Sequence, residues 1–277
     1  MRYGFVVPNN FGVEDPRELV ALACEAESLG FDSVWVNHHV LNVGYVAERL
    51  GDAPYHDALM TLAWIGAATE RVKVGTSVLV MPYLHPMVLA KELATLDHLT
   101  RGRLVVGLGV GSNPGEHEAL GLVPYASRGR YSNEFLGVLR ALWSDGAASF
   151  DGEFFSFSDL QASPKPMQRP GPPILVGGNR PQALARAGRY ADGWHGMSLK
   201  PDSVRKRIPE LVAETAAAGR EPMREFQLRM DLRAVTAESV SAYADAGITE
   251  LVLSLASGDV ARQQQSLRDF AREFIAS

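Results

Sequence analysis

Short apolar runs rich in β-branched residues alternate with helix-like segments along most of the chain. Eight runs can be read as strands, at residues 2–7, 33–36, 72–79, 104–108, 174–176, 193–196, 226–232 and 250–255. Helices placed between strands predict right-handed crossovers and a parallel sheet. Because eight such units close into a ring, we predict an α/β protein with a (β/α)8 TIM barrel, formed as a single domain over residues 1–277. Its site is expected at the carboxyl-terminal ends of the strands.

A doubly wound open sheet is the alternative for such an alternation. Its dinucleotide-binding fingerprint is not met, because Gly107-x-Gly109 would require a third glycine where Ser112 stands. Between Trp143 and Gly171 the alternation stops, and Asp-Gly pairs, phenylalanines and prolines predict a hairpin and a loop. We therefore expect an insertion between strands four and five, near the mouth of the barrel.

The composition narrows the classes of partner and compartment. The chain has 27 basic and 32 acidic residues, a net charge of −5, and no run rich in lysine or arginine, so no nucleic-acid partner is expected. No apolar stretch reaches the length of a membrane span or forms a signal peptide, so no membrane association is expected. Cys24 is the single cysteine, which excludes an internal disulfide and is typical of a reducing compartment. We therefore expect a cytoplasmic protein.

A buried strand, a glycine pair and a helix follow one another in the second half of the chain. The strand ends in Gly177-Gly178, Asn179 or Arg180 is expected near the helix N-cap, and Pro181 lies in the first turn. Such a turn exposes backbone N–H groups at the positive end of a helix dipole, where an anion can approach the main chain. A phosphate is the expected guest, and a simple tight turn is the alternative.

The predicted strand ends bring several polar residues to one side of the barrel. They are Asn9 and Asn10, His38 and His39, Thr76 to Val78, Gly109 to Ser112, Gly177 to Asn179, and Trp194 and His195. This set contains no convergent group of carboxylates. A histidine in such a place is a candidate general acid or base because its pKa lies near neutrality, although a loop histidine bonded to the backbone is equally compatible.

A metal site is not expected. His38 and His39 point to opposite sides while the strand continues, so they are poor joint ligands. The pair His117-Glu118 lacks the second histidine of the zinc motif, since Gly121 stands in its place.

Glycines at 107, 109 and 111 indicate that something passes close to the backbone there. A flat ring or tight packing of strand against strand would each satisfy this pattern. Together with the phosphate cradle and the lack of a metal motif, the pattern favours a bound organic cofactor that carries the difficult chemistry.

Four ordered motifs resemble the luciferase-like monooxygenase superfamily, in particular its coenzyme F420-dependent oxidoreductases. They are GFDSVWVNHH at 30–39, VGTSV at 74–78, LTRGR at 99–103 with GLGVG at 107–111, and Gly177-Gly178 through ADGW at 191–194. The resemblance covers nearly the entire chain. It implies a barrel, often dimeric, with FMN or coenzyme F420 lying across the strand ends.

Together, the strand-end reading and the resemblance give a set of candidate site residues. The expected cofactor contacts are His38, Thr76, Ser77, Val78, Gly109, Gly111, Ser112, Gly177, Gly178, Asn179 and Arg180. Asn10 and Trp194 are candidates for the substrate pocket, with a place in the core as the alternative for Trp194. His39 matches the histidine that faces the reactive side of the ring and would move a proton as a hydride is transferred, or hold the substrate's oxygen. In F420-using members the third strand contains a non-prolyl cis peptide, and the matching bond here is Ser77–Val78.

Three positions depart from the family pattern. His38 stands where relatives have an acidic residue, so a hydrogen bond to the cofactor is changed. Ser112 replaces a glutamate of the sugar-phosphate dehydrogenases, which disfavours a sugar-phosphate substrate. Val110 replaces an arginine that several FMN-using relatives use for the phosphate, which favours F420.

The first hypothesis is therefore F420-dependent hydride transfer to or from a small organic substrate. The second is an FMN-dependent monooxygenase that uses O2 and a partner flavin reductase. The third, from another class, is a barrel that binds a cofactor or ligand without turnover. A homodimer is expected.

Overall fold

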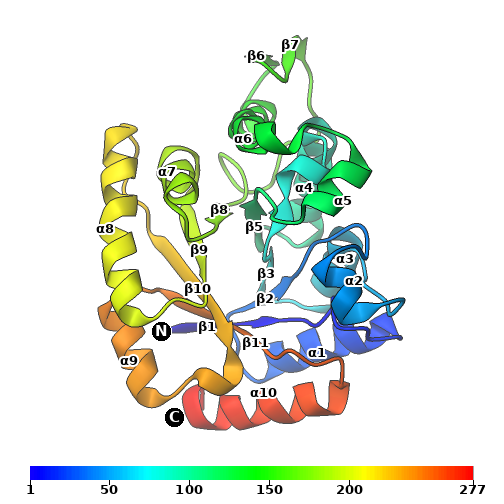
Figure 1. Ribbon diagram of the computed structural model, residues 1–277, viewed down its shortest axis with the longest axis vertical. Coiled ribbons are helices and arrows are strands. Elements are labelled where there is room, and N and C mark those ends of the chain that lie inside the picture. The colour runs from blue at the N-terminus through cyan, green and yellow to red at the C-terminus, as the bar shows by residue number, and fades with distance from the viewer. Residues whose placement is uncertain (277) are drawn as a thin grey trace.

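Eight parallel strands close into a barrel in the computed structural model of the chain, which describes residues 1–276 (Figure 1). The barrel strands are β1 (Arg2–Val6), β2 (Ser33–Val36), β3 (Lys73–Thr76), β5 (Leu104–Gly109), β8 (Ile174–Gly177), β9 (Gly193–Met197), β10 (Glu225–Asp231) and β11 (Glu250–Ser254). They pair in sequence order, β1 joins β11, and β3 joins β5. The predicted TIM barrel is confirmed. The third strand is interrupted after Thr76 and resumes as β4 (Leu79–Val80), which pairs with β5.

Helices surround the barrel and connect its strands (Figure 1). They are α1 (Pro16–Ser28), α3 (Ala58–Ala68), α4 (Pro86–Leu99), α6 (Arg128–Trp143), α7 (Pro181–Tyr190), α8 (Pro201–Ala217), α9 (Ala237–Asp245) and α10 (Val260–Phe274). Several begin at residues suited to that position: the carboxylates of Asp15 and Asp57 accept backbone N–H groups of the first turns of α1 and α3. No helix within residues 1–276 has the length and apolar character needed to cross a membrane.

Loops at the carboxyl-terminal ends of the strands contain short helices that the sequence pattern does not predict. They are α2 (Tyr45–Leu50), α5 (Pro114–Leu120), and the 3-10 helices η1 (Met81–Tyr83), η2 (Tyr125–Ser127) and η3 (Leu232–Ala234). The predicted insertion between the fourth and fifth barrel strands is confirmed. After α6 it continues as an antiparallel hairpin, β6 (Ala148–Asp151) and β7 (Ser156–Leu160), which projects away from the barrel at the top of Figure 1.

Strand side chains alternate between the barrel interior and the layer under the helices. A small interior cluster contains Val6, Trp35, Val105, Leu175 and Val252, whereas the larger apolar cluster joins the outer faces of the strands to the helices. Trp35 is fully buried, and a Cβ at Gly75 would overlap its ring. The glycine therefore leaves room for the indole inside the barrel.

Gly107 is required by contact between neighbouring strands. A Cβ at this position would overlap the backbone carbonyl oxygen of Thr76, which cannot swing aside as a side chain could. We expect Gly107→Ala to lower the free energy of unfolding in urea by about 1 to 3 kcal/mol. Gly115→Ala, whose Cβ would meet only Asn113 Oδ1 at 3.8 Å, serves as the control and should cost nothing. Equal stability of the two variants would contradict this interpretation.

Candidate active site

His39 is held by a buried carboxylate. It follows β2, and its Nδ1 is hydrogen-bonded to Glu116 Oε2. Glu116 Oε1 also accepts the backbone N–H groups of Val40 at 2.6 Å and Leu41 at 3.1 Å. Burial acts to raise the pKa of Glu116, but the hydrogen bonds from His39, Val40 and Leu41 outweigh it and lower the pKa below its ordinary value. Glu116 is therefore an ionised acceptor that fixes the proton of His39 on Nδ1.

Glu116 was not among the predicted site residues, because it does not directly follow a strand. It is a single carboxylate, and the strand-end residues named above still offer no convergent group of them. Glu116 lies in the first turn of α5, seven residues beyond the end of β5. The helix begins at Pro114, and its C-cap, Gly121, has the left-handed conformation. Pro114 and Gly121 are a start and a stop signal for a helix, and they could have placed Glu116 above the fourth strand.

Tyrosines surround His39 on its remaining sides. The Tyr45 hydroxyl lies 2.8 Å from His39 Nε2, and the rings of Tyr45, Tyr55 and Tyr83 lie 5.5, 5.8 and 6.5 Å from the imidazole. With the Nδ1 proton donated to Glu116, a neutral His39 accepts at Nε2, so the Tyr45 hydroxyl donates to it. Carboxylate, imidazole and phenol thus form a relay in which Nε2 can take up or release a proton.

His38 is oriented differently from its neighbour. It is buried, and its Nδ1 accepts the backbone N–H of Val80 in β4 at 3.1 Å. Burial lowers the pKa of His38 to about 4, so the ring is neutral near pH 7. His38 fastens the resumed third strand, and its predicted role toward a cofactor stays a prediction.

The break in the third strand contains the expected cis peptide between Ser77 and Val78, which confirms that prediction. The Thr76 hydroxyl donates to the Gly107 carbonyl at 2.8 Å and accepts the Gly107 N–H at 3.0 Å. The side chain of Val78 occupies the space above the neighbouring strands, since a Cβ at Gly109 would lie 2.6 Å from its Cγ2. Of the two explanations left open for the glycine pattern, packing against the third strand accounts for Gly107 and Gly109.

A column of hydrogen bonds runs down the barrel interior below Ser77. His195 Nε2 lies 2.9 Å from Ser77 Oγ, and its Nδ1 lies 3.0 Å from Gln227 Oε1. The Gln227 amide then donates to Glu250 Oε2 at 3.0 Å, and the Ser33 hydroxyl is bonded to Glu250 Oε1. Because an amide oxygen only accepts, His195 carries its proton on Nδ1 and accepts the Ser77 hydroxyl at Nε2. Every donor in the column points toward Glu250.

The two buried histidines predict a loss of stability in mild acid. Burial lowers the pKa of His195 to about 4, as it does for His38. The unfolded chain binds these protons near pH 6.5 and the folded chain does not, so each histidine should remove up to about 3 kcal/mol as the pH falls from 6.5 to 4. Urea unfolding across this range measures the slope. His195→Gln should flatten it, whereas His98→Ala, at an exposed residue of α4, should not; an unchanged slope in His195→Gln would contradict the assignment.

The glycine turn after β8 is open to an anion. Gly178 has φ 126°, and a Cβ there would lie 2.9 Å from Ala183 Cβ. The Asn179 amide is occupied by the backbone of Met197, with hydrogen bonds of 2.7 and 3.1 Å. Arg180 is exposed and is the N-cap of α7, with no side-chain hydrogen bond to the first turn. Pro181 has no N–H, and the N–H groups of Gly178 and Ala183 already donate to backbone carbonyls. The Gln182 N–H and the Arg180 guanidinium are therefore donors that this turn offers a phosphate.

Of the remaining predicted residues, three lie at this end of the barrel and one does not. Gly111, with φ 72°, and the exposed Ser112 lie in the loop after β5. Asn10 lies near the end of β2, where its Oδ1 accepts a hydrogen bond from Asn37 Nδ2 at 2.9 Å. Trp194 lies elsewhere, because its strand position faces the helices. It is fully buried in the outer core and donates its indole N–H to the Gly178 carbonyl at 2.8 Å. The predicted pocket role of Trp194 is therefore wrong, and the residue supports the glycine turn from beneath.

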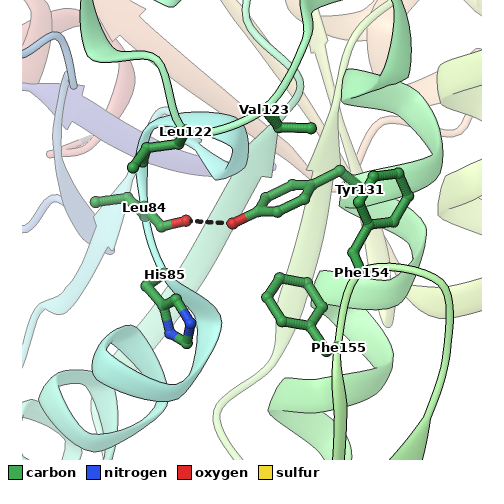
Figure 2. Close-up of a pocket in the computed structure, with 7 residues that line it drawn as sticks. All are labelled: Leu84, His85, Leu122, Val123, Tyr131, Phe154 and Phe155. Atoms are coloured by element: carbon green, nitrogen blue, oxygen red, sulfur yellow. Dashed lines mark hydrogen bonds between the residues drawn. The ribbon is translucent and has the colours of Figure 1, made fainter.

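A cavity of about 260 Å³ lies outside this site, between the start of α4 and the insertion (Figure 2). Leu84, His85, Leu122, Val123, Tyr131, Phe154 and Phe155 line it, and none was predicted as a site residue. The Tyr131 hydroxyl donates to the Leu84 carbonyl at 2.8 Å across it (Figure 2). Within residues 1–276 no cluster of three metal-ligating side chains is found.

A family description of luciferase-like monooxygenases matches residues 1–273. The chain belongs to the luciferase-like monooxygenase family. An uncharacterised Mycobacterium bovis protein is 34% identical over 92% of both chains. The FMNH2-dependent dimethylsulfone monooxygenase of Pseudomonas putida is 32% identical over 72% of this chain, and the F420-dependent glucose-6-phosphate dehydrogenase of Kineococcus radiotolerans is 35% identical over 74%. The matched parts span 53% and 60% of those two proteins.

Solved structures support the luciferase-like fold over the whole chain. A monooxygenase of Streptomyces bottropensis superposes with a TM-score of 0.81 at 23% identity, covering 99% of both chains. An F420-dependent secondary alcohol dehydrogenase, solved with an F420-acetone adduct, gives 0.80 at 20% identity over 97% of both. The family is one of flavin- or F420-dependent oxidoreductases and monooxygenases. Of the relatives named here, one depends on FMNH2 and another on F420.

Proposed function

We propose that this luciferase-like protein is an F420-dependent oxidoreductase that moves a hydride to or from a small organic substrate. The observation that carries the proposal is the Glu116–His39–Tyr45 relay, which lies at the same barrel end as the Ser77–Val78 break and the glycine turn. Hydride transfer to a carbonyl requires a proton at oxygen, and the reverse reaction requires a base. Neutral His39 can take up a proton at Nε2 through the Tyr45 hydroxyl bonded there, and the imidazolium so formed, held by Glu116, can return that proton in the reverse direction.

The residues present fit a phosphate-tailed flat cofactor. The positive φ of Gly178 and the open N-terminus of α7 suit its phosphate, with Arg180 supplying a charge. Residues 76–78 would support its ring. When bound, F420 would supply or accept the hydride. Glu116 keeps the proton of His39 on Nδ1. The Tyr45 hydroxyl shields Nε2 from water and can pass a proton to or from this nitrogen.

FMN with O2 is the second candidate, since a relative such as the dimethylsulfone monooxygenase depends on FMNH2. It would require a partner flavin reductase. What favours F420 is Val110, an apolar residue in the loop after β5 where several FMN-using members place an arginine for the phosphate.

Absorbance titration of the purified protein with F420 and with FMN tests the proposal. We expect F420 to bind in the low micromolar range or tighter and FMN to bind at least tenfold more weakly. Tight FMN binding with oxygen consumption from reduced FMN would replace the proposal by the monooxygenase. Tight F420 binding without oxidation or reduction of any small alcohol, ketone or enone would favour the non-catalytic barrel.

We also propose a homodimer formed through α3. This helix has no charged residue, and it exposes Met60 (67%) and Trp64 (46%) although it lies on the outside of the barrel. Trp64→Glu should convert a dimer into a monomer in size-exclusion chromatography with light scattering. Val212→Glu, at an equally exposed apolar residue of α8, is the control. A Trp64→Glu variant that stays dimeric would contradict an interface on α3.

A further inference from the structure

Arg229 is a half-buried cation whose hydrogen-bond partners are all neutral. It lies near the end of β10, and its Nη1 donates to Asn37 Oδ1. The same nitrogen donates to the Ser77 carbonyl oxygen at 3.1 Å and to the Ser77 hydroxyl oxygen at 3.2 Å. Burial lowers the pKa of Arg229 to about 10, so the guanidinium stays charged at neutral pH. Among the groups that act on this pKa there is no carboxylate. A charge held partly out of water without a counter-charge is costly, so its presence favours a ligand at this place.

Other arginines of the barrel are held within the chain by more than one guanidinium nitrogen, although Nε of Arg103 has no partner among the described residues. Arg220 pairs with Asp192. Arg103 and Arg186 lack carboxylates, but two nitrogens of each guanidinium donate to carbonyl, hydroxyl or amide oxygens. In Arg229 only Nη1 has a hydrogen-bond partner within residues 1–276. Nη2 and Nε are left as donors.

Tyr55 supplies a second unused donor beside it. Its hydroxyl is buried and has no hydrogen-bond partner among the described residues. Burial raises the pKa of Tyr55, while the charges of Arg49 and Arg229 act to lower it, so both arginines lie near the phenol. The Tyr55 ring also contacts His39, with 5.8 Å between centroids. Donors and positive charge thus converge next to the proton-transfer residue.

We propose that Arg229 and Tyr55 form a binding site for a negatively charged oxygen group, such as a carboxylate, beside His39. Asn37 and Ser77 hold the guanidinium in place through Nη1, which leaves Nη2 and Nε for the ligand. The carboxylate of Glu116 does not compete, because its oxygens are taken by His39 and two backbone N–H groups. Arg49, exposed at the end of α2, adds to the positive potential over the site.

The inference deepens the proposed function, because it names the chemistry of the ligand at that site. Two sources can supply the anionic oxygen: an acid group of the substrate, or the oxygen-bearing edge of the reduced cofactor ring. The experiment starts with the protein free of cofactor, so its failure would leave the F420 proposal standing, and the failure of F420 to bind would leave this site standing.

The probe is propionate, compared with the isosteric neutral amide propionamide at constant ionic strength. Binding is followed by NMR through the Arg229 side-chain Nε–H resonance, assigned by its absence from Arg229→Lys. We expect propionate to bind at least tenfold more tightly than propionamide. Propionate displaced by saturating F420 would assign the site to the cofactor edge, and propionate retained in a ternary complex would assign it to the substrate's acid group.

Tyr55→Phe separates binding from folding. The lost hydroxyl has no partner in the protein, so the melting temperature should stay the same or rise, while propionate binding should weaken at least threefold. Tyr131→Phe is the matched control: its hydroxyl donates to Leu84, so it should melt at a lower temperature and bind propionate normally. Equal binding of propionate and propionamide, or unchanged propionate binding in Tyr55→Phe, would overturn the proposal.

Discussion

His39→Ala is expected to lower turnover at saturating cofactor by about 10²- to 10⁴-fold, the range typical of a lost general acid or base. Nε2 of His39 is the group that the relay prepares for proton transfer, with its partner nitrogen fixed by Glu116 and its outer side covered by Tyr45. Since the phosphate turn and the Ser77–Val78 break are untouched, the cofactor dissociation constant should change less than threefold. Single-turnover kinetics with parallel absorbance titration measure both quantities.

Added imidazole gives a second readout for the same variant. It should restore part of the lost turnover of His39→Ala by supplying the missing acid or base, and leave the cofactor dissociation constant unchanged. His98→Ala, remote on α4, controls for the loss of any imidazole and should retain full turnover. A His39→Ala variant in which affinity for the cofactor falls as much as turnover would identify His39 as a binding residue instead.

Glu116→Ala should be the most destabilising substitution at the site. Removing the carboxylate leaves the N–H groups of Val40 and Leu41 and the Nδ1 proton of His39 without their acceptor in a buried place. We expect the free energy of unfolding to fall by about 3 to 5 kcal/mol, as when one partner of a buried charged pair is removed. Glu116→Gln keeps one acceptor oxygen and should lose roughly half as much. Urea unfolding at pH 7 measures both.

The dependence of the unfolding free energy on pH separates the contribution of the charge on Glu116 from that of its shape. The folded pKa of Glu116 is lowered, so its contribution is complete above the unfolded value near 4.3 and is lost as the pH falls through the folded pKa. Glu116→Gln should therefore approach the parent in stability below pH 4. This window lies below the one set by His38 and His195. A constant difference between Glu116→Gln and the parent from pH 7 to pH 3 would count against an ionised carboxylate.

The barrel could be predicted from the sequence because its signals are local. Each β-branched run and each capped helix carries its own pattern, and the crossover rule converts eight of them into a closed sheet. The hairpin of residues 148–160 was likewise marked by turn residues. The position of His39 followed from the end of β2, and the Ser77–Val78 peptide followed from the family resemblance.

What could not be predicted depends on contacts between distant segments. Glu116 meets His39 across 77 positions of sequence, and Arg229 meets Asn37 across 192. Trp194 was misplaced because a two-residue period does not say which face of a barrel strand is inside. The glycines at 107 and 109 could be explained only once Thr76 and Val78 were seen against them.

The directional column inside the barrel has a consequence for how this interior can vary. Each member gives its hydrogen to the next, from Ser77 through His195 and Gln227 to Glu250. Substituting either middle member, His195 or Gln227, by an apolar residue orphans a donor above and an acceptor below, so a single change costs twice. Chains descended from a common ancestor should therefore retain these four residues together or have exchanged them as a set. Replacing His195 and Gln227 together by apolar residues leaves one orphaned donor and one orphaned acceptor, as either single change does, so the second change should cost far less than the first.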